Sequence, residues 1–147
     1  ELGGDVQVVA TLHADWLTDK AYNVTTDLIN SGTEFNYIFA NNDMMAQGCY
    51  NALKDAGKEN IPIVSTGGSP DGFKMLQDGI EAANMTAPVS IQGVKTFMNL
   101  YNKVALGEDP AEKFTALPVI PVSADDTSSY IAWDDYAAAY KYLGENK

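Results

Sequence analysis

The sequence predicts an α/β fold: a doubly wound, mainly parallel sheet with helices on both faces. Short runs of apolar and β-branched residues recur along the 147-residue chain, and amphipathic segments with helical spacing separate them. Three of these amphipathic segments end at a glycine, which is how helices commonly stop. Connections of this length join parallel strands through right-handed crossovers, so one doubly wound sheet follows.

The first half of the chain contains two strand–helix units and a third strand. Apolar side chains recur at spacings of three and four through the helical segments, and Gly32 and Gly57 end them. Asp43 lies where its side chain can cap the second helix. The expected elements are strands at 5–11, 37–40 and 61–64, with helices at 17–31 and 43–56.

The second half continues the alternation. Ser69 followed by Pro70 is a strong helix start, because the serine can accept from free amides and proline lacks one. The longest helix follows Pro88 and ends at Gly107. The expected elements are a helix after 69, a strand near 81–85, a helix from 88 to 105, a hinge-region strand at 117–122 and a terminal helix at 133–143.

Composition excludes several classes of protein. A net charge of -11, with only nine basic residues, opposes binding to nucleic acid. No apolar run approaches the roughly 20 residues of a membrane-spanning helix, and no export signal is visible at Glu1, although a processed or truncated chain would look the same. The single cysteine, Cys49, is expected to be a small buried hydrophobe rather than a reactive thiol.

Ligands of doubly wound sheets bind beyond the carboxyl ends of the strands. Trp16 follows the first expected strand and offers a flat face for the apolar side of a sugar ring, or it holds its helix on the sheet. Asn42, after the second strand, can donate to and accept from a hydroxyl. Segment 66–69 has free amides that could hold an anion, but a plain tight turn is favoured because the nucleotide-binding glycines are absent.

No constellation for catalysis is present in the sequence. The single histidine, His13, has no serine or cysteine in an elbow-type motif nearby. One histidine and one cysteine cannot make a zinc site, and the paired aspartates lack the spacing of a calcium loop. We therefore expect no catalytic residue, no metal, no cofactor and no enzymatic activity.

Three segments resemble the ribose-binding branch of the periplasmic solute-binding proteins. Segment 14–16 looks like the family's A-D-[FW] turn, 39–48 is similar to F-A-x-N-D-x-M-A-x-G, and 68–72 resembles G-[TS]-P-D-G. The likeness covers nearly the whole chain. It implies one lobe of a type I periplasmic-binding-protein fold, which we take as the carboxy-terminal one.

The resemblance also implies a function and partners. It implies non-covalent binding of a monosaccharide-like solute between two lobes, delivery to an ABC permease, and a place outside the cytoplasm, in the periplasm or lipid-anchored on the cell surface. Trp16 would stack on the sugar and Asn42 would bond its hydroxyls, with Asp15 in the same turn. The expected ligand-binding residues are Asp15, Trp16, Asn42, Thr66, Gly67, Ser69 and Thr86.

The sequence departs from the family at two polar positions. Gly67 stands where the family usually has an acidic residue, and Ala87 stands where ribose binders carry a glutamine. Each lost hydrogen bond could contribute on the order of 1 kcal/mol. A larger or less hydroxylated solute is therefore expected to use the space over Gly67, with Thr66, Ser69 or Thr86 as replacement donors.

By the family pattern, residues 1–147 form a single partial domain that lacks its first strand–helix unit and the amino-terminal lobe. The absent strand belongs between the strands at 5–11 and 37–40, so unpaired backbone groups are expected there. We expect another chain, such as a second copy, or a rearranged segment to fill the gap.

Two other classes share this pattern. The effector-binding domain of a lactose-repressor-type regulator has the same fold and the F-A-x-N-D segment, but segment 82–86 resembles the transporter branch. A flavodoxin-like enzyme or response regulator also alternates strands and helices. The acidic cluster and the phospho-acceptor aspartate that response regulators need are missing from the strand ends.

Overall fold

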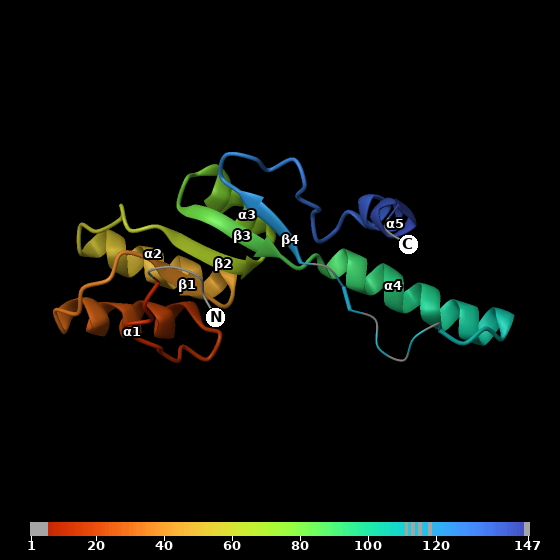
Figure 1. Ribbon diagram of the computed structural model, residues 1–147, viewed down its shortest axis with the longest axis horizontal. Helices are drawn as coiled ribbons and strands as arrows, with labels where there is room; N and C mark the ends of the chain where they lie inside the picture. Colours follow the sequence, from red (N-terminus) through yellow and green to blue (C-terminus); the bar gives the residue numbers. More distant parts are fainter. Residues whose placement is uncertain (1–5, 111, 113, 115, 118, 146–147) are drawn as a thin grey trace.

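A computed structural model of the chain describes residues 6–110, 112, 114, 116, 117 and 119–145. Helices and strands alternate through most of this part, as Figure 1 shows. The elements are α1 (Thr18–Asn30), β1 (Ile38–Ala40), α2 (Asp43–Asp55), β2 (Ile63–Gly67), α3 (Pro70–Gln77), β3 (Glu81–Thr86), α4 (Val89–Tyr101), a π-helical turn η1 (Asn102–Leu106), β4 (Ile120–Ser123) and α5 (Tyr136–Glu145).

The four strands form one sheet in the order β1-β2-β3-β4. β1, β2 and β3 are parallel, and β4 is antiparallel to β3. The mostly parallel α/β fold expected from the sequence is thus confirmed. The pairing of β2 with β3 contains a bulge, since Ile63 lies opposite Glu81 but Val64 lies opposite Ala83.

Two apolar clusters hold the elements together. The first joins α1 and α2 to β1 and β2 around the fully buried Leu53 and Ile63. The second joins α3, α4, β4 and α5 around Leu76, Ile91 and Val122. In Figure 1, α1 and α2 lie side by side toward one end of the molecule, whereas α4 and α5 lie toward the other end.

The strand expected at 5–11 is not formed in the described residues. Residues 6–11 are exposed and pair with no strand, and Asp5 lies outside the described part. β1 is the edge of the sheet, and a cavity of about 300 Å³ lies between segment 9–16 and β1. A strand needs a hydrogen-bonded neighbour, so the missing neighbour explains why this apolar run stays unpaired.

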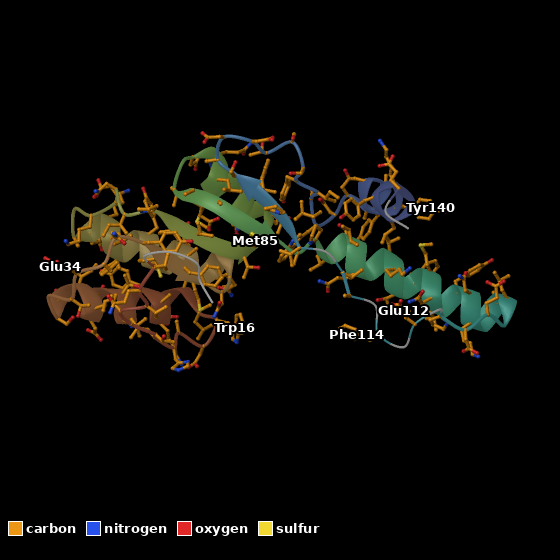
Figure 2. All side chains as sticks on the ribbon, viewed as in Figure 1. Trp16, Glu34, Met85, Glu112, Phe114 and Tyr140 are labelled. Atoms are coloured by element: carbon orange, nitrogen blue, oxygen red, sulfur yellow. The ribbon has the colours of Figure 1, made fainter. Side chains whose placement is uncertain are left out.

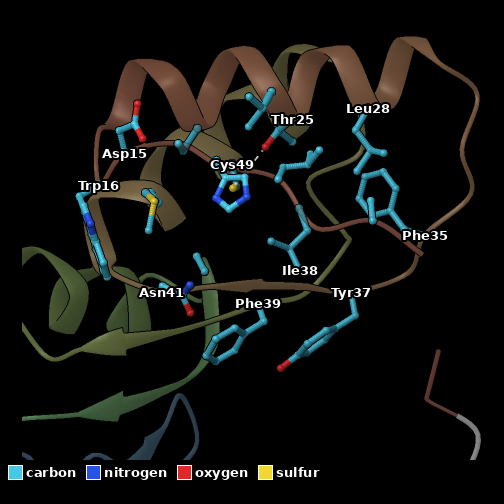
Figure 3. A pocket seen from close by; sticks show the side chains of 18 of the residues that line it. Asp15, Trp16, Thr25, Leu28, Phe35, Tyr37, Ile38, Phe39, Asn41 and Cys49 are labelled. Carbon is cyan, nitrogen blue, oxygen red and sulfur yellow. Dashed lines mark hydrogen bonds between the residues drawn. The ribbon is translucent and has the colours of Figure 1, made fainter. Parts of the chain in front are cut away.

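No described segment of the chain fills that gap. Filling by another chain or by a rearranged segment stays a prediction. Figure 3 shows Ile38 pointing from β1 into the cavity, while Tyr37 and Phe39 project from the other side of the strand. The gap is therefore lined by apolar side chains and by an unpaired strand edge.

The terminal helix begins later than expected. Asp135 accepts a hydrogen bond from the Ala138 amide at 2.8 Å, which caps the first turn. Trp133, expected inside the helix, instead lies before it and donates from Nε1 to the Gly67 carbonyl at 3.3 Å. β4 at Ile120–Ser123 overlaps the strand expected at 117–122, and its assignment as a hinge stays a prediction.

Candidate ligand-binding site

The carboxyl ends of β1, β2 and β3 lie at one edge of the sheet because the three strands are parallel. The turn before α1 joins them, since Asn42 Nδ2 donates to the Trp16 carbonyl at 3.4 Å. This rim, formed by residues 14–16, 41–43, 66–69 and 86–88, brings together the turns that the sequence marked as candidate binding loops.

Trp16 is 62% exposed, so the structure does not use it to hold α1 on the sheet. Figure 2 shows it projecting beyond the amino-terminal end of α1. Asp15 and Trp16 both have positive φ, at 47° and 66°, which is uncommon for residues other than glycine. Lys20 binds Asp15 at 2.6 Å and lowers the pKa of that carboxyl. An unusual backbone thus presents a bare indole face.

The expectation that Asp43 caps the second helix is wrong. Asn42, and not Asp43, caps α2: its Oδ1 accepts from the Met45 amide at 2.7 Å. A residue within the first helical turn cannot cap it, and α2 begins at Asp43. Asp43 is instead buried, and its Oδ2 accepts from the Ser69 amide at 2.7 Å. It therefore ties the start of α3 to the start of α2.

Gly67 and Gly68 have φ of 144° and 76°. A Cβ on Gly67 would lie 2.8 Å from Asp43 Oδ2, and one on Gly68 would lie 2.6 Å from Thr86 Cβ. Both positions therefore require glycine. The side-chain space at Gly67, which we expected to be open to a larger solute, is already filled by Asp43.

The three hydroxyls expected as replacement donors all have partners within the chain. Thr66 Oγ1 donates to the Met85 carbonyl at 2.8 Å, and Ser69 Oγ accepts from the Gly72 amide at 3.1 Å as the cap of α3. Thr86 has no exposed surface and donates to the Ile120 carbonyl at 2.8 Å. A contact from Thr86 to solute would require this hydrogen bond to break and the chain around it to open.

A buried polar network beneath the rim was not expected from the sequence. Ser65 on β2 and Glu81 and Asn84 on β3 are completely buried, and Asp43 is 5% exposed. The signal was present as four polar residues in or next to strands, but the bulge at Ala82 could not be read from the sequence. That bulge places Glu81 and Asn84, three residues apart, on the same face.

Burial raises the pKa of Glu81 from its ordinary value of 4.5 to about 7. Hydrogen bonds from Asn84 and Ser65 oppose this shift, and the negative charge of Asp43 adds to it.

Aromatic side chains after β4 cover the turn between β2 and α3. Tyr130 stacks on Phe73 with ring centroids 3.8 Å apart, and its hydroxyl donates to the Gly68 carbonyl at 3.2 Å. Together with Trp133 on the Gly67 carbonyl, it fixes the position of this turn. Sequence reasoning missed this contact, because it joins residues more than 60 positions apart.

The described residues offer little for catalysis or metal binding. They contain no group of three or more side chains suited to hold a metal ion. Cys49 is buried, Thr25 donates to its sulfur at 3.3 Å, and burial raises the pKa of its thiol. Among the same residues, no helix has both the length and the apolar character needed to cross a bilayer.

Known proteins resemble the chain in sequence. Residues 1–109 match the family described as "Periplasmic binding protein domain". The ribose import binding protein RbsB of Salmonella typhimurium is 35% identical over 107 residues, which are 73% of this chain and 36% of the relative. The D-allose-binding periplasmic protein of Escherichia coli is 36% identical over 86 residues, covering 58% of this chain and 26% of the relative.

The fold resembles solved structures of the same kind. An ABC transporter solute-binding protein from Bacillus halodurans, solved with bound myo-inositol, aligns with a TM-score of 0.72 and 21% identity over 95% of this chain and 44% of that one. The chain thus spans between a quarter and a half of the length of these relatives. The family match covers well over half of the chain, and the chain therefore belongs to the periplasmic binding protein family, whose members bind solutes and are not enzymes.

Proposed function

We propose that the chain forms one wall of the ligand cleft in an extracytoplasmic sugar-binding protein that serves an ABC importer. The observation that carries the proposal is the exposed indole of Trp16, held by a strained turn at the rim of the parallel strands. Such a backbone persists only where the surrounding structure enforces it, and it is found most often at functional sites. Relatives named for ribose and allose binding support a sugar as the solute.

In this proposal, Trp16 stacks on the apolar face of a monosaccharide-like ring. Asn42 keeps its cap and contributes the amide hydrogen that does not face the Trp16 carbonyl. Asp15 accepts from a solute hydroxyl at the same turn, because it is exposed and the lysine that pairs with it is exposed as well. Thr66 and Ser69 accept hydrogen bonds from the solute, since each hydroxyl oxygen retains a free lone pair.

The solute differs from ribose in this proposal. Gly67 supplies no carboxylate, and the space above it is closed by Asp43. Ala87 donates only its backbone amide, to the Gly67 carbonyl at 3.0 Å. The site therefore favours a solute that depends more on stacking than on hydroxyl contacts, and tight ribose binding would contradict this.

The remainder of the binding protein packs against α4 in this proposal. Phe97, Leu100 and Val104 on α4 and η1 are 67%, 60% and 77% exposed, and large apolar side chains in such a row mark an interface. The proposed protein also has a second lobe and delivers its solute to an ABC permease. It lies in the periplasm or is lipid-anchored on the cell surface. The regulator alternative is less favoured, because the relatives described above are import or sugar-binding proteins.

The test is a thermal-shift screen of the intact protein against pentoses, hexoses, polyols and small non-sugar solutes. A binding solute should raise the melting temperature, and Trp16→Ala should abolish the shift. Tyr140→Ala is the matched control, since Tyr140 is also 62% exposed but lies on α5. No shift with any solute, together with binding to duplex DNA, would favour the regulator instead.

A further inference from the structure

The network beneath the rim has fewer hydrogens than contacts. Asn84 Nδ2 lies 2.7 Å from Asp43 Oδ1, 2.7 Å from Ser65 Oγ and 3.0 Å from Glu81 Oε2. Ser65 Oγ lies 3.1 Å from Asp43 Oδ1 and 2.9 Å from Glu81 Oε1. The amide has two hydrogens and the hydroxyl has one. Three hydrogens therefore serve five close contacts.

Ser65 lacks a hydrogen for one of its two carboxylate contacts. Its single hydrogen can point at Asp43 or at Glu81, but not at both. If both carboxyl groups are ionised, one oxygen pair about 3 Å apart has no hydrogen between its members. A proton on one of the two carboxyl groups removes the conflict. Asp43 already accepts from the Ser69 amide through its other oxygen, whereas Glu81 is completely buried, so we place the proton on Glu81. Glu81 can then donate to Ser65, which donates to Asp43.

The orientation of Asn84 does not offer another solution. Turning its amide around would place Oδ1 against Asp43 and Glu81 oxygens, which are acceptors themselves. In the observed orientation Oδ1 is buried without a partner among the described residues, which is unfavourable. This orientation is still the better one, because both amide hydrogens are needed for the Asp43, Ser65 and Glu81 oxygens.

Among the described residues, no cation is paired with either of the two carboxyl groups. The elements around Glu81 are β2, β4, α2 and α3, and within the same residues Asp43 is the ionisable group on them that affects Glu81. On α3, Lys74 pairs with Asp78 at the surface, and Asp71 is exposed. Within the described residues, the other ion pairs, those of Lys20, Lys103 and Lys141, also lie at the surface.

We propose that the Asp43–Ser65–Glu81–Asn84 network holds one proton on Glu81 near neutral pH, and that loss of this proton loosens the rim turn 67–69. The link to the turn is direct. Asp43 Oδ2 accepts from the Ser69 amide, and the Asp43 carboxyl fills the space at Gly67 and Gly72. Ionised Glu81 places a second negative charge next to Asp43. Repulsion between the two carboxylates then weakens the hydrogen bond from the Ser69 amide and the packing of Asp43 against Gly67 and Gly72. The consequence for solute affinity rests on the proposed function, whereas the bound proton does not.

Folding should depend on pH in a defined direction. The folded chain binds this proton more tightly than the unfolded chain, whose glutamate has its ordinary pKa of 4.5. The stabilising effect is therefore complete below pH 4.5 and is lost as the pH rises through about 7. Between pH 6 and pH 8 the folding equilibrium constant should fall roughly tenfold through this group alone.

The test compares the intact protein with Glu81→Gln, which keeps the shape of the side chain and provides a donor without ionising. The control is Glu59→Gln, which removes an exposed carboxyl in a surface turn. Unfolding by denaturant at pH 6 and pH 8, without ligand, should show the tenfold loss in the wild type and in Glu59→Gln. It should be absent in Glu81→Gln, and an equal loss in all three would overturn the proposal.

Two measurements remain decisive if Glu81→Gln fails to fold. In the wild type, the carboxyl carbon of Glu81 should titrate in NMR with a midpoint near 7, and a midpoint at its ordinary 4.5 would overturn the proposal. Hydrogen-exchange protection of the Ser69 amide should fall across the same range, and unchanged protection would overturn its link to the rim. Because neither measurement uses a solute, failure here is distinct from failure of the proposed function.

Discussion

Asn42 and Asp43 are adjacent polar residues after β1 with different structural roles. Both types cap helices, so the sequence left the choice to position alone. The structure gives the cap to Asn42 and buries Asp43 under the rim. A one-residue difference in where α2 begins decides the matter, and helix starts are the least certain part of a sequence-based prediction.

Replacing Asn42 separates its structural role from its proposed binding role. Asn42→Ala should destabilise the fold by about 1 kcal/mol, since the Met45 amide loses its acceptor. Asn42→Ser should keep nearly all of the stability, because serine caps as well as asparagine. Denaturant unfolding measures both variants. If Asn42→Ser folds normally but loses the solute-induced shift, the amide contacts solute; equal stability of the two variants would exclude the cap.

Restoring the family's acidic residue at Gly67 should not create a ribose site. Gly67→Asp places a Cβ 2.8 Å from Asp43 Oδ2, at a φ of 144°, and brings a second carboxyl group next to Asp43. We expect a loss of at least about 2 kcal/mol, as for other clashes at a special backbone position. The control is Gly79→Asp, where φ is also positive but no atom lies within 4 Å, and about 1 kcal/mol should be lost. A stable Gly67→Asp that binds ribose would contradict the prediction.

At the scale of elements, the sequence predicted those helices whose position depends on local sequence patterns. Apolar spacing and glycine stops located α1, α2 and the long helix that ends at Gly107, whose φ is 72°. It could not predict features that depend on distant partners. Segment 6–11 has the composition of a strand but no neighbour to pair with, and the bulge at Ala82 arises only when β3 pairs with β2.

The same limit explains what was found of the candidate site. The rim was predictable, because parallel strands must bring their carboxyl ends to one edge. The contacts of Trp133 and Tyr130 with the turn 67–68 were not, since they depend on how the chain returns after β4. The sequence also does not show which side chains already have hydrogen-bond partners. Nothing in it indicates that the Thr86 hydroxyl donates to the Ile120 carbonyl.

Two helical glycines give a matched test of how α1 packs on α2. A Cβ on Gly48 of α2 would meet the Thr18 carbonyl and lie 2.8 Å from Ala21 Cβ, whereas one on Gly93 of α4 meets no atom within 4 Å. Gly48→Ala should therefore destabilise the fold by about 2–3 kcal/mol. Gly93→Ala should stabilise it by about 0.5–1 kcal/mol through helix propensity. The melting temperatures of the two variants test this prediction. Similar effects on stability would show that α1 can move away from α2 at little energetic cost.

At the scale of the whole molecule, two apolar surfaces have no cover within the described chain. One is the outer edge of β1, where the Ile38 amide already donates toward β2. Since alternate residues of a parallel strand bond to opposite sides, the backbone groups of Phe39 are left for another strand. The other is the face of α4 and η1 that carries Phe97 and Val104. The strand edge offers hydrogen bonds as well as apolar area, so it is the more specific surface.

We therefore expect residues 1–147, produced alone, to associate through the β1 edge. Phe39→Lys places a charge on that edge, a change that blocks strand addition, and should weaken association at least roughly tenfold in sedimentation velocity. Phe97→Lys is the matched control, because Phe97 is 67% exposed and Phe39 is 55% exposed. If Phe97→Lys alone gives monomers, copies meet through α4 instead. A wild type that stays monomeric at high concentration would show that the open edge is tolerated, and that unpaired backbone groups there are satisfied by water.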